Sequence, residues 1–125
     1  TSNAGSKDFQ TLQYNGKHIY ESVMETVSTW GSVGNLMFVT GATKASDLKA
    51  LRAQFPQHFF LVPGVGAQGG TVKDVCDNAI TDFGGLLINA SRSILYAGKG
   101  KDYIEKAREE AVKLQSECAS ALQNL

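Results

Sequence analysis

Three short apolar runs, separated by helical patterns, constrain the fold of this chain more than any other feature. The runs cover residues 36–39, 59–62 and 86–88, and none alternates between apolar and polar side chains. Runs of this length without alternation are typical of strands buried on both faces, as in a parallel sheet. Their starts lie 23 residues (36 to 59) and 27 residues (59 to 86) apart, which suits strand–helix units. The sequence therefore predicts an α/β fold with parallel strands and right-handed crossovers.

Helices are predicted before, between and after these runs. Residues 18–30 carry one apolar stripe at helical spacing, which ends at Gly31. Ser46, Thr71 and Asp102 are each expected to cap a further helix, over residues 46–55, over 71–79 and from 102 onward. The inward stripe of the last helix is predicted to be Tyr103, Ile104, Ala107, Ala111, Leu114, Cys118 and Leu122.

Composition and charge exclude several classes of function. Twelve basic and twelve acidic residues give a formal net charge of zero, so nothing in the composition indicates nucleic-acid binding. No uncharged apolar run approaches the ~18–20 residues that span a membrane, and the polar first ten residues are unlike a signal peptide. Cys76 and Cys118 show no metal-binding spacing and are interpreted as buried free thiols in a reducing, cytoplasmic setting.

Ligands of parallel α/β folds bind where the strands end, so the residues after each run are the candidates for a site. After the second run, residues 63–70 read PGVGAQGG. Glycines let the backbone approach an anion and present its N–H groups, and Gln68 adds a side chain that can donate and accept. The alternative is that the glycines serve turn geometry alone. The loop lacks the GK[ST] of a P-loop, and no ribose-binding acid follows the next strand, which ends at Asn89.

After the third run, Ser91 and Arg92 occupy the corresponding position. An arginine at a strand end suits bidentate contact with phosphate, although a surface arginine without a ligand is the simpler alternative. In eight-stranded barrels a phosphate site often forms between the loops after the seventh and eighth strands. The two loops are expected to be that pair if these strands are the last of eight. Three strands are too few to close a barrel, which indicates that further chain is needed.

Four segments resemble orotidine 5′-phosphate decarboxylase, in the longer bacterial branch of that family. Residues 60–70 (FLVPGVGAQGG) are similar to its seventh-strand phosphate loop, and residues 88–94 (INASRSI) to its eighth-strand arginine motif. Residues 37–43 (MFVTGAT) resemble its sixth strand, and residues 1–6 (TSNAGS) the loop that leaves its fifth strand. The resemblance implies that residues 1–125 are the C-terminal half of one (β/α)8 (TIM) barrel domain, without a second domain.

The resemblance also implies roles for individual residues, and it implies no metal or cofactor. The substrate would be orotidine 5′-monophosphate and the product uridine 5′-monophosphate. Gln68 and Arg92 would hold the 5′-phosphate, and the backbone N–H groups of Ser91 and Arg92 would add donors. Ser2 would contact the amide edge of the pyrimidine. The remaining predicted contacts are apolar ones that cover the ring, from Pro63 and Val65.

The catalytic motif of the family, Asp-x-Lys-x-x-Asp at the third strand, is absent from this sequence. Asp47-Leu48-Lys49 begins in the same way, but residue 52 is Arg and the segment is predicted to be helical. The chain alone is therefore expected to bind without catalysing decarboxylation. Two alternatives stay open: a phosphosugar lyase or isomerase on the same barrel, and a half barrel that binds phosphate without catalysis.

A half barrel leaves the inward faces of its strands and its sheet edges uncovered. We therefore expect this chain to be stable only with the N-terminal half of the same protein or as a homo-oligomer, such as a dimer.

Overall fold

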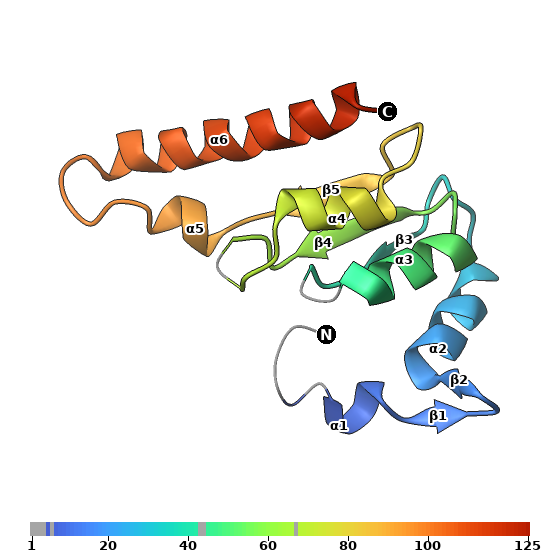
Figure 1. The fold of residues 1–125 in the computed structure, drawn as a ribbon. Helices are drawn as coiled ribbons and strands as arrows, with labels where there is room; N and C mark the ends of the chain where they lie inside the picture. The colour runs from blue at the N-terminus through green and yellow to red at the C-terminus, as the bar shows by residue number, and fades with distance from the viewer. Residues whose placement is uncertain (1–4, 6, 43–44, 67) are drawn as a thin grey trace.

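The structure is a computed structural model, which describes residue 5 and residues 7–42, 45–66 and 68–125. Helices alternate along the chain with the strands of a parallel sheet (Figure 1). In chain order the elements are α1 (Lys7–Gln10), β1 (Gln13–Tyr14), β2 (Lys17–His18), α2 (Ile19–Ser28), β3 (Met37–Val39), α3 (Ala45–Gln54), β4 (Phe59–Pro63), α4 (Val72–Ala79), β5 (Leu86–Asn89), α5 (Arg92–Leu95) and α6 (Tyr103–Gln123).

The three predicted strands form one parallel sheet in the order β3-β4-β5. Phe38 pairs with Phe60, and Phe60 with Leu86, so the strands run side by side in chain order. The predicted parallel α/β architecture is confirmed. A small antiparallel hairpin of β1 and β2 was not predicted. Its turn is Asn15-Gly16, with φ of 52° and 78°, and this dipeptide is the signal that would have revealed it.

One face of the sheet carries the core, under α3 and α4. Phe60 and Val62 are fully buried there, together with Leu48 of α3 and Val75 of α4. Apolar burial of this kind is the main stabilising term of the fold. Met24 of α2 and Leu114 of α6 extend the core at its margins.

The opposite face of the sheet is open. Met37, Val39 and Leu87 are 50%, 67% and 44% exposed, so the prediction of strands buried on both faces is wrong for this chain. The physical reason is that the helices cover only one face. The second prediction, that a half barrel leaves inward strand faces uncovered, is confirmed by the same three side chains.

Of the three predicted helix caps, the structure confirms one, Thr71. The Thr71 hydroxyl accepts a hydrogen bond from the backbone N–H of Asp74 at 3.0 Å, as a capping residue should. Ser46 is not a cap, because α3 already begins at Ala45. Asp102 precedes α6 as predicted, but its side chain forms no capping hydrogen bond in the described structure.

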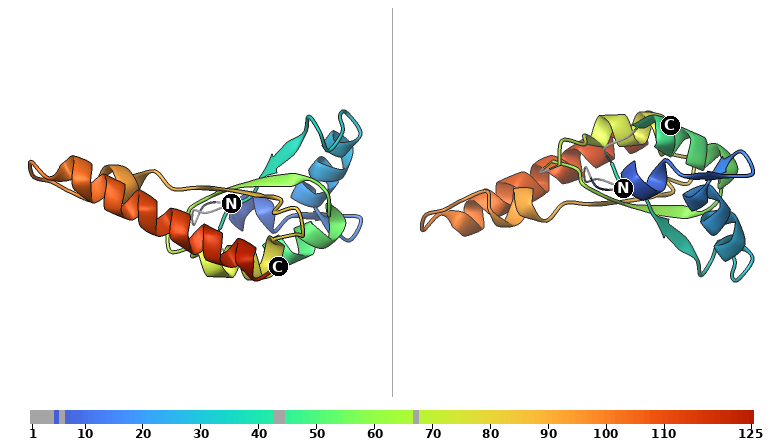
Figure 2. Two further views of the ribbon diagram at one scale, coloured as in Figure 1. Left: turned by 90° about the horizontal axis from the view of Figure 1, so that it is seen from above. Right: turned by 90° about the horizontal axis from the view of Figure 1, so that it is seen from below.

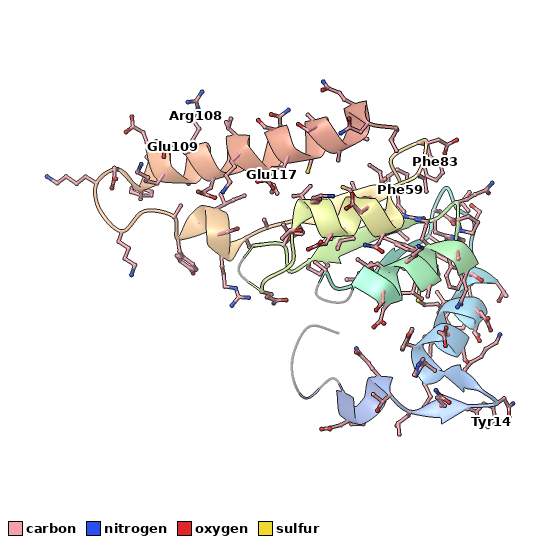
Figure 3. The ribbon with its side chains drawn as sticks, in the orientation of Figure 1. Tyr14, Phe59, Phe83, Arg108, Glu109 and Glu117 are labelled. Atoms are coloured by element: carbon pink, nitrogen blue, oxygen red, sulfur yellow. The ribbon has the colours of Figure 1, made fainter. Side chains whose placement is uncertain are left out.

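The inward stripe of α6 is shorter than predicted. Leu114 and Cys118 pack against the core, whereas Tyr103, Ile104 and Leu122 are exposed. The first half of α6 extends beyond the sheet and lies against the short helix α5 instead (Figure 2). Arg108 points away from the sheet (Figure 3).

Arg52 is a buried cation that joins four segments at the edge where β4 and β5 begin. Arg52 is only 8% exposed. Its guanidinium donates to the carbonyl oxygens of Ala79 (2.8 Å), His58 (2.7 Å) and Gly85 (2.8 Å). The guanidinium carbon lies 4.0 Å from the centre of the Phe60 ring. Burial lowers the pKa of Arg52. These carbonyl acceptors compensate for the removal of the charge from water.

Both cysteines are free, and Cys76 is buried as predicted, while Cys118 is only half-buried. Burial raises the pKa of the Cys76 thiol above its ordinary value of 9.0, and the neighbouring Cys118 adds to the effect. The folded state therefore holds the Cys76 proton more tightly than the unfolded state does.

This difference in proton affinity predicts a loss of stability at alkaline pH. The contribution of Cys76 is fully present below pH 9.0, the unfolded value, and is lost as the pH rises through the higher folded pKa. Between the two pKa values the free energy of unfolding should fall by up to about 1.4 kcal/mol per pH unit. Urea unfolding of wild type and Cys76→Ala, each joined to the N-terminal half of the protein, measures this fall from pH 7 to 11. Parallel pH curves for the two proteins would contradict it.

Candidate phosphate-binding site

The loops that follow β4 and β5 meet at one edge of the sheet and form a cleft of about 140 Å³. Its position follows from the parallel register, which pairs Pro63 with Asn89 as the last residues of their strands. Five of the six predicted site residues line this cleft, while Ser2 lies outside the described residues. The lining residues are Pro63, Gly64, Val65, Gln68, Asn89, Ala90, Ser91 and Arg92.

The glycine loop closes on itself through its own backbone. The N–H groups of Gly66, Gly69 and Gly70 donate to the carbonyl oxygens of Gly70, Gly66 and Gly64 at 2.9, 2.9 and 3.3 Å. Gly64, Gly66 and Gly69 have φ of 103°, 80° and 87°, a region that favours glycine. The prediction that the glycine N–H groups face an anion is therefore wrong for these three donors, which hold the turn together instead.

Close packing fixes this loop against its neighbours. A Cβ on Gly70 would lie 2.6 Å from the Cβ of Ala42, in the loop after β3. A Cβ on Gly66 would lie 3.1 Å from the Oγ of Ser93, in α5. The missing side chains thus let the loops after all three strands come together beside the cleft.

The donors left for an anion are side chains and the backbone after β5. Arg92 is exposed and forms no ion pair among the described residues, and the backbone N–H groups of Ser91 and Arg92 have no acceptor there. The Gln68 side chain folds over Gly64, where its Oε1 lies 2.8 Å from the place of a Cβ. Because no described lining residue carries a carboxylate, the cleft favours an anion.

The cleft is too small for a whole nucleotide. Sites for drug-sized ligands measure roughly 300–1,000 Å³, whereas this cleft measures about 140 Å³. It suits a phosphate group, and the rest of a ligand would have to lie over the open face of the sheet. A larger hollow of about 360 Å³ lies elsewhere, between α2 and α3, and its lining is mainly apolar.

The sequence placed Asn89 at the end of the third strand but gave it no role in the site. Its side chain lines the cleft, and its Oδ1 accepts a hydrogen bond from the Ser91 hydroxyl at 3.3 Å. The structure places Asn89 on the open face, because burial alternates along β5 and Leu87 is exposed between two half-buried neighbours. The Asp47-Leu48-Lys49 segment is helical within α3, as predicted.

No group of three or more His, Cys, Asp or Glu side chains in the described ranges is arranged to hold a metal ion. No helix of the described chain is both long enough and apolar enough to cross a membrane.

Curated relatives and solved structures agree on one family, although no family model matches the chain. The chain is 52% identical over 122 residues to orotidine 5′-phosphate decarboxylase of Flavobacterium johnsoniae and 47% identical over 125 residues to that of Christiangramia forsetii. These alignments cover 98% and 100% of the chain but 45% and 46% of the relatives. The chain thus spans slightly less than half their length, at the C-terminal end.

Solved structures give the same result for the fold. UMP synthase of Leishmania donovani matches with a TM-score of 0.74 and 38% identity, over 94% of this chain and 26% of the other. OMP decarboxylase of the same organism matches with a TM-score of 0.70 and 34% identity, over 93% of this chain and 45% of the other. The resemblance seen in the sequence and the predicted partial (β/α)8 barrel are both confirmed.

Proposed function

We propose that this chain is the C-terminal half of an orotidine 5′-phosphate decarboxylase, the carboxy-lyase that converts orotidine 5′-monophosphate to uridine 5′-monophosphate in pyrimidine biosynthesis. Residues 1–125 form part of one barrel domain in this proposal. The observation that carries it is the carboxylate-free cleft between the loops after β4 and β5. The 52% identity to the Flavobacterium johnsoniae decarboxylase supports the same assignment.

The proposed roles follow from the groups that the cleft presents. Arg92 neutralises the 5′-phosphate and Gln68 donates its amide, while the N–H groups of Ser91 and Arg92 add donors. Pro63 and Val65 cover the pyrimidine ring with apolar surface, and Ser2 contacts the amide edge of the ring. Binding energy from the phosphate, which does not react, is available to stabilise the transition state at the ring.

The proton donor of this reaction is not among the residues of the cleft. When the carbon–carbon bond breaks, carbon dioxide leaves and the electron pair stays on the ring carbon, which then takes a proton. By similarity to the family, a lysine of the Asp-x-Lys-x-x-Asp motif supplies that proton, and this motif is absent from the chain. We infer that the N-terminal half of the protein contributes it.

The open face of the sheet supports this assembly. Met37, Val39 and Leu87 leave apolar surface exposed on the face that would line the barrel, and burial of such surface drives association. We propose that the N-terminal half covers this face, and that the complete protein is a cytoplasmic homodimer. The two free thiols suit a reducing compartment.

A chimera tests the proposed function directly. The segment of the Flavobacterium johnsoniae decarboxylase that precedes its aligned region is joined to residue 1 of this chain. We expect the chimera to convert orotidine 5′-monophosphate, followed by loss of substrate absorbance, because it unites the lysine motif with the phosphate cleft. Each half alone should show no turnover.

The same chimera separates the alternatives. Uridine 5′-monophosphate should raise its unfolding temperature more than a sugar phosphate does, whereas the reverse order would favour a phosphosugar enzyme. A cooperatively folded chimera that binds phosphate but shows no decarboxylation would contradict the proposed function and favour a binding module.

A further inference from the structure

We propose that Asn89 is an additional substrate-binding residue, whose side-chain amide donates to an oxygen of the 5′-phosphate. The proposal rests on the proposed function, since it names a further contact in the same cleft. Asn89 is the last residue of β5 and lines the cleft together with Gln68 and Arg92.

The strand geometry determines which face Asn89 occupies. Side chains alternate along a strand, so Leu87 and Asn89 point to the same face of the sheet. Leu87 is exposed on the open face, whereas Leu86 and Ile88 pack against the core. The same alternation puts Pro63 on the open face, because Phe60 and Val62 are buried on the other one. Pro63 is the register partner of Asn89, so the two side chains stand next to each other at the rim of the open face.

The hydrogen bond from Ser91 determines which end of the amide is available. The Ser91 hydroxyl donates to Oδ1 of Asn89 at 3.3 Å. The Nδ2 group, which carries two hydrogens, has no acceptor among the described residues. An exposed amide that is held through its oxygen presents its donors to the cleft, which suits an anionic oxygen.

The charge of the cleft explains why a neutral donor fits there. Arg92 is the one cation among the described lining residues, and no carboxylate opposes it. An aspartate in place of Asn89 would keep the size of the side chain but replace its two donors with a negative charge. Repulsion between that charge and a phosphate dianion should then add to the loss of the hydrogen bond.

The test compares Asn89→Ala and Asn89→Asp in the chimera, with Gln115→Ala as the control, since Gln115 is an exposed amide on α6. Calorimetry measures the Kd of uridine 5′-monophosphate and of uridine, which lacks the phosphate. We expect Asn89→Ala to weaken the nucleotide about tenfold and Asn89→Asp about a hundredfold or more. Uridine should bind all three variants as it binds the wild type.

Equal weakening of nucleotide and uridine, or a nucleotide Kd unchanged in Asn89→Ala, would overturn the proposal. The unfolding temperature of each variant shows whether a loss reflects damage to the fold. The turnover of the wild-type chimera tests the proposed function separately. An active chimera in which Asn89→Ala binds like wild type therefore rejects the role of Asn89 alone.

Discussion

Replacing Arg92 with alanine in the chimera will lower kcat/KM for orotidine 5′-monophosphate by about two to three orders of magnitude. The guanidinium is the one cation among the described residues that line the cleft. Removing one partner of a close, hydrogen-bonded charge pair costs roughly 2–5 kcal/mol, and each 1.4 kcal/mol corresponds to about a factor of ten. Steady-state kinetics with the orotidine nucleotide measure the effect.

An arginine outside the cleft provides the control for Arg92→Ala. Arg108→Ala removes an exposed arginine on α6 that points away from the sheet (Figure 3), and kcat/KM should stay within a factor of two of wild type. Gln68→Ala should lower kcat/KM less than Arg92→Ala, because it removes a neutral donor. Unchanged efficiency in both Arg92→Ala and Gln68→Ala would show that the cleft does not hold the phosphate.

Much of the fold and the site could be predicted because local rules decide them. Continuous apolar runs indicated the parallel strands. In a parallel sheet the strand ends at Pro63 and Asn89 lie at the same edge, so the loops that follow them meet there. The exposure of Val39 could not be read from the run that contains it. A strand of the same composition is buried or open depending on whether another layer covers it.

The role of the glycine loop illustrates a second limit. The pattern of residues 63–70 indicated an anion site, but not which groups make it. Positive φ angles allow the glycine N–H groups to bond to carbonyl oxygens of the same loop. The donors available to an anion are therefore the neighbouring side chains and the backbone N–H groups after β5. Asn89 was missed for a related reason, since its role depends on a strand face and on the hydrogen bond from Ser91.

Replacing Arg52 with alanine will destabilise the chimera by about 3–5 kcal/mol. The substitution removes a donor from the buried carbonyl oxygens of Ala79 and Gly85 and from the part-buried carbonyl oxygen of His58. The Gly85 oxygen keeps its bond from the Phe60 N–H at 3.0 Å, and the space over the Phe60 ring is emptied. Unsatisfied buried acceptors cost about 1–3 kcal/mol each, and a cavity adds to that cost. Since whole domains are stable by only about 5–15 kcal/mol, this variant should lie near the limit of folding.

Urea unfolding monitored by circular dichroism measures the change in the free energy of unfolding. Two further variants serve as comparisons. Arg52→Lys should recover little stability, because an ammonium group cannot reproduce the planar guanidinium, which donates to the carbonyl oxygens of Ala79 and Gly85 at the same time. Arg108→Ala should change the free energy of unfolding by less than about 0.5 kcal/mol, as exposed substitutions do. If Arg52→Ala unfolds at the same urea concentration as Arg108→Ala, Arg52 does not hold the starts of β4 and β5 together.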